Sequence, residues 1–217
     1  MKILEIKKLA IPEIKIIKFA RFCDDRGYFT EKFRKSDLLN IPSLEGLKNA
    51  EFVQTNQIFS KKNTIRGLHF QWNPYMGKLV HIVCGRMTEI ILDIRIGSPT
   101  FGKSICYDMR TDVRKDNDEW IWVPPGFAHG NFYKEDSIME YYCTGEYNEN
   151  SEAGISPLAK DINWFLCDKK DKEEFDKISS KGLLSDKDKK GFSLSDWERD
   201  DRSKNFIYEE LIQKKLC

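Results

Sequence analysis

The chain has 217 residues, a length that fits one large domain or a domain with an appendage. Its 36 basic and 35 acidic residues nearly cancel, so no overall field favours nucleic acid or an anionic membrane. The charged first eight residues are unlike a secretory signal, and no apolar run approaches membrane-spanning length. Six scattered cysteines without a C-x-x-C pair indicate free thiols. We therefore expect a cytoplasmic protein that binds neither nucleic acid nor a membrane.

The N-terminal part is rich in β-branched and aromatic residues, and residues 2–22 predict short strands. A turn at residues 24–27 precedes an alternating segment that extends to Phe33. Arg26 in this turn is either a solvated charge or an anion clamp. Glu31 shares a face with Phe29 and Phe33, as a structural carboxylate or as a polar group in a pocket wall. Residues 34–50 predict a helix and a surface loop.

Two polar strands follow. Gln54 and Asn56 share one face of a strand over residues 52–57, where they either stitch the sheet or face a ligand. In the strand over residues 64–71, His69 and Gln71 share a face, and Arg66 falls on the other face unless a bulge re-aims it. Within its own strand, His69 is as compatible with a core imidazole as with a functional group.

Further strands are predicted at residues 78–84, 87–95, 104–109, 120–130 and 137–147, separated by Gly and Pro turns. Little helix lies between residues 50 and 147, whereas a doubly wound parallel sheet would need a helix between successive strands. The pattern predicts an all-β antiparallel sandwich or barrel.

After Trp164 the composition changes, and residues 168–190 become dense in Asp, Lys and Glu. This segment predicts a short helix and a loop packed on the barrel. Residues 204–216 carry apolar side chains at helical spacing and predict one amphipathic helix. We therefore divide the chain into a barrel domain, residues 1–165, and a C-terminal helical extension, residues 166–217.

The chain has only three histidines, His69, His81 and His129. No H-x-H motif or second ligand close to His69 is present, so we expect no metal. General acid–base chemistry fits better, with His69 as a base near neutral pH. Such a base needs a carboxylate to orient it and an opposing proton donor. The candidate donors are Tyr141, Tyr142 and Tyr147, all of which could equally be packing residues.

Cationic groups are also available for an anionic substrate. Lys78 begins its strand beside a Gly turn, where it is either a solvated charge or a cation that stabilises a developing oxyanion. Guanidinium forks match phosphate oxygens. The residues that together would bind a phosphorylated ligand are Arg26, Arg66, Gln54 and Asn56.

Nine short motifs occur along the chain in a fixed order. They are Asp25-Arg-Gly-Tyr-Phe-Thr-Glu31, Gln54-Thr-Asn56, Arg66-Gly-Leu-His-Phe-Gln71, Gly77-Lys-Leu79, Asp93-Ile-Arg95, Ser98-Pro-Thr-Phe-Gly102, Pro124-Pro-Gly-Phe-Ala-His-Gly130, Tyr141-Tyr-Cys-Thr144 and Leu184-Ser-Asp-Lys-Asp188. Over residues 3–190 the chain resembles the dTDP-4-dehydrorhamnose 3,5-epimerase family. The resemblance implies a cupin jelly-roll fold and a homodimer. It also implies a metal- and cofactor-free epimerase for a nucleotide-diphosphate 4-keto-6-deoxy sugar.

The resemblance also implies roles for individual residues. His69 would be the base, oriented by Asp188, and Lys78 would lie near the C4 oxygen. Tyr141 would be the acid, with Tyr142 as the alternative because the inserted Asn131 shifts the register. The substrate-binding positions would be Arg26, Phe29, Glu31, Gln54, Asn56, Arg66, Gln71, His129 and Tyr147.

Three other functions remain open from the sequence. A cupin ketoisomerase would move the carbonyl of a similar substrate, a sugar-nucleotide-binding cupin would have no activity, and a cupin oxygenase would need a transition metal. The epimerised centre (C3, C5 or both), the sugar (hexose or heptose) and the nucleotide (dTDP, GDP or CDP) are likewise open.

Overall fold

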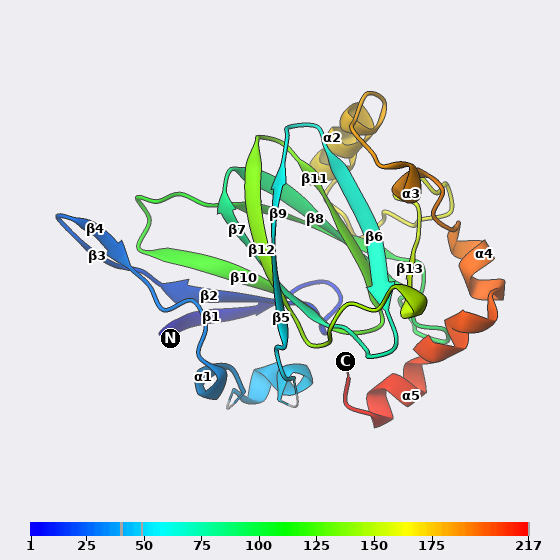
Figure 1. Cartoon of the computed structure of the whole chain (residues 1–217), viewed down its shortest axis with the longest axis horizontal. Coiled ribbons are helices and arrows are strands. Elements are labelled where there is room, and N and C mark those ends of the chain that lie inside the picture. Colours follow the sequence, from blue (N-terminus) through cyan, green and yellow to red (C-terminus); the bar gives the residue numbers. More distant parts are fainter. Residues whose placement is uncertain (40, 49, 217) are drawn as a thin grey trace.

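The computed structural model describes residues 1–39, 41–48 and 50–216, and two antiparallel sheets form its centre (Figure 1). The six-stranded sheet has the order β1 (Ile3–Lys8), β2 (Lys15–Ala20), β10 (Asn117–Val123), β7 (Lys78–Cys84), β12 (Ser137–Cys143) and β5 (Gln54–Ser60). The five-stranded sheet has the order β13 (Glu152–Gly154), β6 (Ile65–Gln71), β11 (Phe127–Tyr133), β8 (Arg86–Asp93) and β9 (Ser104–Arg110). This arrangement confirms the predicted all-β antiparallel barrel.

The central strands, such as β8 and β11, bury side chains on both faces, which explains their near-continuous apolar sequences. Val80 of β7 and Ile121 of β10 point into the barrel, where they meet Ile91 of β8. Their neighbours Leu79 and Trp120 point outward into a second cluster. Because side chains alternate along a strand, each sheet therefore needs an outer cover as well as the shared interior.

Helices supply these covers. The outer face of the six-stranded sheet packs against α1 (Lys35–Leu39) and the 3-10 helix Pro42–Leu47. The outer face of the five-stranded sheet packs against the C-terminal segment, drawn in orange to red in Figure 1. That segment contains α2 (Lys169–Ser179), α3 (Asp186–Lys189), α4 (Leu194–Arg199), the 3-10 helix Asp201–Phe206 and α5 (Tyr208–Gln213). It shares one apolar cluster with the barrel, and the domain boundary at residue 165 stays a prediction.

Two predicted elements were wrong in extent. The strand after the first turn ends at Phe29 instead of Phe33, and β3 (Phe22–Asp24) and β4 (Gly27–Phe29) form a short hairpin that projects from the barrel. The predicted helix over residues 204–216 is interrupted. Ile96 accepts a hydrogen bond from the Tyr208 backbone and donates one to the Phe206 carbonyl, at 2.9 and 2.8 Å, which draws this part of the chain out of a helix.

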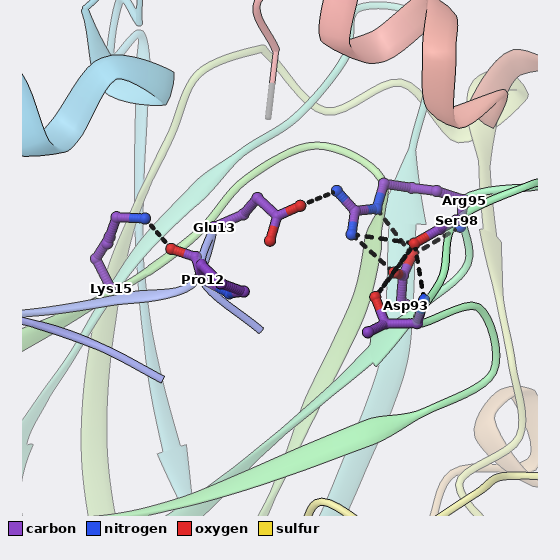
Figure 2. A network of polar contacts seen from close by, with 7 residues as sticks. Pro12, Glu13, Lys15, Asp93, Arg95 and Ser98 are labelled. Carbon is purple, nitrogen blue, oxygen red and sulfur yellow. Dashed lines mark hydrogen bonds and ion pairs between the residues drawn. The ribbon is translucent and has the colours of Figure 1, made fainter. Parts of the chain in front are cut away.

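A largely buried ionic cluster joins the loop after β8 to the loop between β1 and β2 (Figure 2). Arg95, after β8, donates to both carboxylate oxygens of Asp93, at 2.9 and 2.7 Å, and to Glu13, at 2.7 Å, in the loop between β1 and β2. Ser98 donates to Asp93 at 2.6 Å. The Arg95 guanidinium also lies 4.9 Å from the ring of Tyr208, at the start of α5. Two of the sequence motifs, residues 93–95 and 98–102, thus hold the fold together.

Among the described residues, no helix is long and apolar enough to cross a membrane.

Candidate active site

A bulge in β6 brings Arg66 and His69 to the same cavity. Across the strand pair, His129 lies opposite His69 and Asn131 opposite Arg66, so β6 has one residue more than β11 at this point. Gly67 has a φ of +106°, and a Cβ there would lie 2.6 Å from the Gly130 Cα. Glycine at both positions therefore permits the bulge. The structure confirms the expectation that Arg66 needs a bulge to join His69.

Asp188 orients His69 from the far end of the chain. The carboxylate of Asp188, in α3, lies 2.7 Å from His69 Nε2 and is 6% exposed. Burial would raise the pKa of Asp188, but hydrogen bonds from His69, Ser185 and the Gly67 backbone outweigh it and lower the pKa. Asp188 is therefore ionised and accepts a hydrogen bond from Nε2–H of His69, which leaves Nδ1 as the basic nitrogen.

Lys78 and His129 form a second polar group in the same cavity. Lys78 Nζ, at the start of β7, lies 2.7 Å from His129 Nε2 in β11. His129 Nδ1 lies 2.5 Å from Glu89 Oε1 in β8. Burial lowers the pKa of Lys78, and burial together with the nearby Lys78 charge lowers that of His129. The amine of Lys78 thus lies beside an imidazole that burial keeps neutral.

Alternation along β12 separates Tyr141 from Tyr142. Tyr141 lines the cavity, with Lys78 Nζ 5.7 Å from its ring centroid. Tyr142 points outward and packs edge-on against Phe33, with ring centroids 5.4 Å apart. Burial raises the pKa of Tyr141, so its hydroxyl carries a proton at neutral pH. Of the two tyrosines, only Tyr141 is therefore placed to donate a proton in this cavity.

Two adjoining cavities, of about 180 and 490 Å³, share His69, Lys78 and Tyr141 in their walls. The smaller cavity also includes Arg66, His129 and Asp188. The larger one includes Gln54, Asn56, Gln71 and Tyr147. Gln54 Nε2 donates to Asn56 Oδ1 at 3.1 Å, so the two predicted amides lie together on the cavity side of β5. The enclosed volumes suit a small ligand with a polar extension.

Three predicted binding residues lie elsewhere in the chain. Arg26 is exposed in the β3–β4 turn and pairs with Asp24 at 2.7 Å. Phe29, at the end of the hairpin, is 69% exposed. Glu31 pairs with Arg34 at 2.7 Å, because the strand predicted to present it ends before it. None of the three lines the described cavities.

The structure also adds polar residues that sequence analysis did not select. Glu89 and Asn131 lie behind His129, where only the strand register brings them together. Lys187 lines both cavities and forms an ion pair with Glu152. Its position next to Asp188 in a motif was a usable signal for Lys187. The third histidine, His81, faces away from the cavity and bonds to Asp118 at 2.9 Å.

Comparison with known proteins gives consistent matches. A family model described as dTDP-4-dehydrorhamnose 3,5-epimerase matches residues 8–196. The enzyme of that name from Sinorhizobium fredii is 37% identical over 163 residues, which cover 73% of this chain and 79% of the relative. The Escherichia coli K12 enzyme is 32% identical over 196 residues, covering 89% and 96%.

Among solved structures, the dTDP-6-deoxy-D-glucose-3,5-epimerase of Legionella pneumophila, solved with dTDP-4-keto-L-rhamnose, has a TM-score of 0.73. It is 31% identical, and the match covers 94% of this chain and 97% of that one. The cupin jelly-roll barrel and these relatives define a carbohydrate epimerase, which is an isomerase. This chain belongs to the dTDP-4-dehydrorhamnose 3,5-epimerase family. The predicted family, fold class and enzyme class are confirmed.

Proposed function

We propose that the chain inverts C3, C5 or both in a dTDP-linked 4-keto-6-deoxy sugar, as a step in deoxysugar biosynthesis in the cytoplasm. The main support is that one cavity contains a histidine–carboxylate pair, a lysine and a tyrosine. The names of the relatives point to the same substrate class. A binding protein without activity would have no need for an oriented base beside a buried proton donor.

The proposed reaction begins with removal of a proton next to the ketone. A carbonyl at C4 acidifies the protons at C3 and C5, because the resulting carbanion is delocalised as an enolate. His69 takes the proton on Nδ1, while Asp188 holds Nε2–H and stabilises the imidazolium that forms. Only protons move, so the route needs no redox cofactor and no metal.

Lys78 and Tyr141 complete the inversion. The Lys78 ammonium stabilises the negative charge that develops on the C4 oxygen. Tyr141 then protonates the carbon from the face opposite His69, which inverts the centre. Because burial raises the pKa of Tyr141, the hydroxyl is an intact donor at neutral pH.

The nucleotide diphosphate would occupy the polar side of the cavities. Arg66 is held by Ser60 Oγ at 2.9 Å and, with Lys187, supplies positive charge for phosphate oxygens. Gln54, Asn56 and Gln71 offer amides, and Tyr147 offers an exposed ring beside them. These residues suit a base and a ribose next to the diphosphate.

Arg26, Phe29 and Glu31 fit the proposal if the protein is a homodimer. The β3–β4 hairpin projects from the barrel and exposes Phe22, Tyr28 and Phe29. A two-stranded hairpin is marginally stable alone and needs a packing partner. A second copy of the chain would supply one, and the hairpin would then extend into the cavity of that copy.

Incubation with dTDP-4-keto-6-deoxyglucose in D2O, followed by NMR, tests the proposed reaction. Deuterium should enter at C3, C5 or both, and His69→Asn should reduce exchange by about 10²-fold or more. Tyr141→Phe should permit exchange but suppress inversion, whereas Tyr142→Phe, the matched control, should leave both exchange and inversion at wild-type levels.

Other outcomes would oppose the proposal. Absence of exchange with dTDP-, GDP- and CDP-linked 4-keto sugars would exclude it, and a carbonyl that moves to another carbon would indicate a ketoisomerase. Stoichiometric transition metal that is required for activity would indicate an oxygenase.

A further inference from the structure

Glu89 is a fully buried carboxylate in the barrel interior, 0% exposed, and the proposed reaction does not itself use it. It lies on β8, opposite Asn131 of β11, and its two oxygens have different partners. Oε1 lies 2.5 Å from His129 Nδ1, and Oε2 accepts from Asn131 Nδ2 at 3.0 Å. A buried carboxylate is costly unless it is paired, so this arrangement requires an explanation beyond packing.

The two ring nitrogens of His129 have opposite roles: one donates a hydrogen bond and the other accepts one. The Glu89 carboxylate can only accept, so His129 Nδ1, 2.5 Å away, carries the hydrogen and donates it to Glu89. His129 Nε2 is then without a hydrogen and accepts a hydrogen bond from Lys78 Nζ at 2.7 Å. Burial and the Lys78 charge both lower the pKa of His129, which keeps the imidazole neutral in this tautomer.

We propose that Glu89, acting through His129, is a positioning residue that keeps Lys78 protonated and directs its ammonium into the cavity. This inference rests on the proposed function, in which Lys78 stabilises the enolate. The positive charge of Lys78 would then depend on Glu89, a residue that contacts neither the substrate nor Lys78.

The other charges around Lys78 do not replace Glu89. Burial is the largest influence on the pKa of Lys78 and lowers it. Cys143 of β12, Glu89 of β8 and Glu152 of β13 act in the opposite direction and raise it. Burial raises the pKa of Cys143, so this thiol is neutral near pH 7. Glu152 is already paired with Lys187. The other titratable or charged groups in this cavity wall are His69, Asp188, Arg66, Tyr141 and Lys187.

Glu89→Gln removes the charge while preserving the shape of the site. In the variant, the glutamine NH2 would face Asn131 Nδ2, which in the wild type donates to Glu89 Oε2. Asn131 Oδ1 is buried and has no hydrogen-bond partner among the described residues. A rotated Asn131 amide therefore accepts from the new glutamine, and the glutamine oxygen still accepts from His129. Glu119→Gln, the same exchange at β10 beside Tyr107, is the matched control.

The first measurement is the dependence of kcat and kcat/KM on pH. Glu89 favours the protonated form of Lys78, so its loss should move the alkaline limit of activity down by about one pH unit or more. At pH values above both alkaline limits, kcat should fall by about tenfold with little change in KM, and the loss should shrink at lower pH. Glu119→Gln should keep the wild-type profile. A loss that is uniform across pH would mean that Glu89 is merely structural and would overturn the inference.

A second measurement does not need turnover. NMR of ¹⁵N-histidine protein reads the His129 tautomer, and competitive acetylation with mass spectrometry reads the free-amine fraction of Lys78. Nδ1-protonated His129 in the wild type and about tenfold faster acetylation of Lys78 in Glu89→Gln, at a pH below the alkaline limits of both proteins, would support the inference. Unchanged acetylation or an Nε2-protonated His129 would overturn it. If the wild type epimerises no 4-keto sugar, the proposed function fails while these two readouts still decide the role of Glu89.

Discussion

At the scale of single residues, the site depends on contacts that sequence distance hides. His69 and Asp188 are 119 positions apart, and only the resemblance to a family paired them in advance. Strand alternation alone separates Tyr141 from Tyr142, once the register of β12 is known. Glu89 escaped prediction because its role depends on two neighbouring strands, and no local pattern encodes that pairing.

Replacing Asp188 by Asn should separate its catalytic role from its structural one. The amide cannot stabilise an imidazolium at His69, so kcat/KM should fall by about 10²–10⁴-fold. The lowered pKa of Asp188 also stabilises the fold above the carboxyl pKa of the unfolded chain, about 3.9, and this contribution is lost as pH falls through the folded pKa. Denaturant curves at pH 7 and pH 3 should therefore show a larger difference between the proteins at pH 7. A variant with wild-type kcat/KM would contradict the proposed orientation of His69.

At the scale of elements, apolar runs bounded by Gly and Pro turns located the strands well, because the central strands are buried on both faces. It failed where tertiary contacts decide the backbone. The bulge in β6 depends on the close approach of Gly67 to Gly130, a residue of another strand. The predicted C-terminal helix is interrupted because residues 206–208 bond to Ile96. The segment of α4 lay beyond the recognised motifs, yet its Trp197 is completely buried against β6.

Trp197→Ala tests whether the C-terminal segment is a structural part of the barrel. The Trp197 ring centroid lies 4.7 Å from that of Phe70, and truncation should lower the free energy of unfolding by about 3–5 kcal/mol. Phe165→Ala, at an aromatic that is 84% exposed, should change it by less than about 0.5 kcal/mol. Urea unfolding followed by circular dichroism measures both. A single transition would indicate one cooperative unit, whereas a separate early transition in Trp197→Ala would support independent folding of residues 166–217.

At the scale of the whole molecule, the β3–β4 hairpin lies outside the packed layers of the described residues. The barrel is enclosed by α1 on one outer face and by the C-terminal helices on the other, whereas the β3–β4 hairpin extends beyond both (Figure 1). The motif over residues 25–31 therefore resembles a substrate-binding motif but lies away from the cavity of its own chain. In a symmetric dimer, the hairpin of each copy would contact the other copy in the same way.

Mixing two defective chains decides whether the hairpin acts in its own subunit or in the partner. One chain carries His69→Asn, and the other carries Arg26→Ala with Phe29→Ala, which should lower kcat/KM on its own by about tenfold or more. If the hairpin completes the partner's cavity, a mixed dimer contains one site with both defects and one intact site. Equal mixing with free subunit exchange then restores roughly a quarter of wild-type activity. If each hairpin serves its own cavity, both sites of the mixed dimer stay defective and mixing restores nothing. Light scattering on the wild type and on each variant tests the proposed dimer. If all three are dimers, a failure to regain activity counts against the shared site and not against assembly.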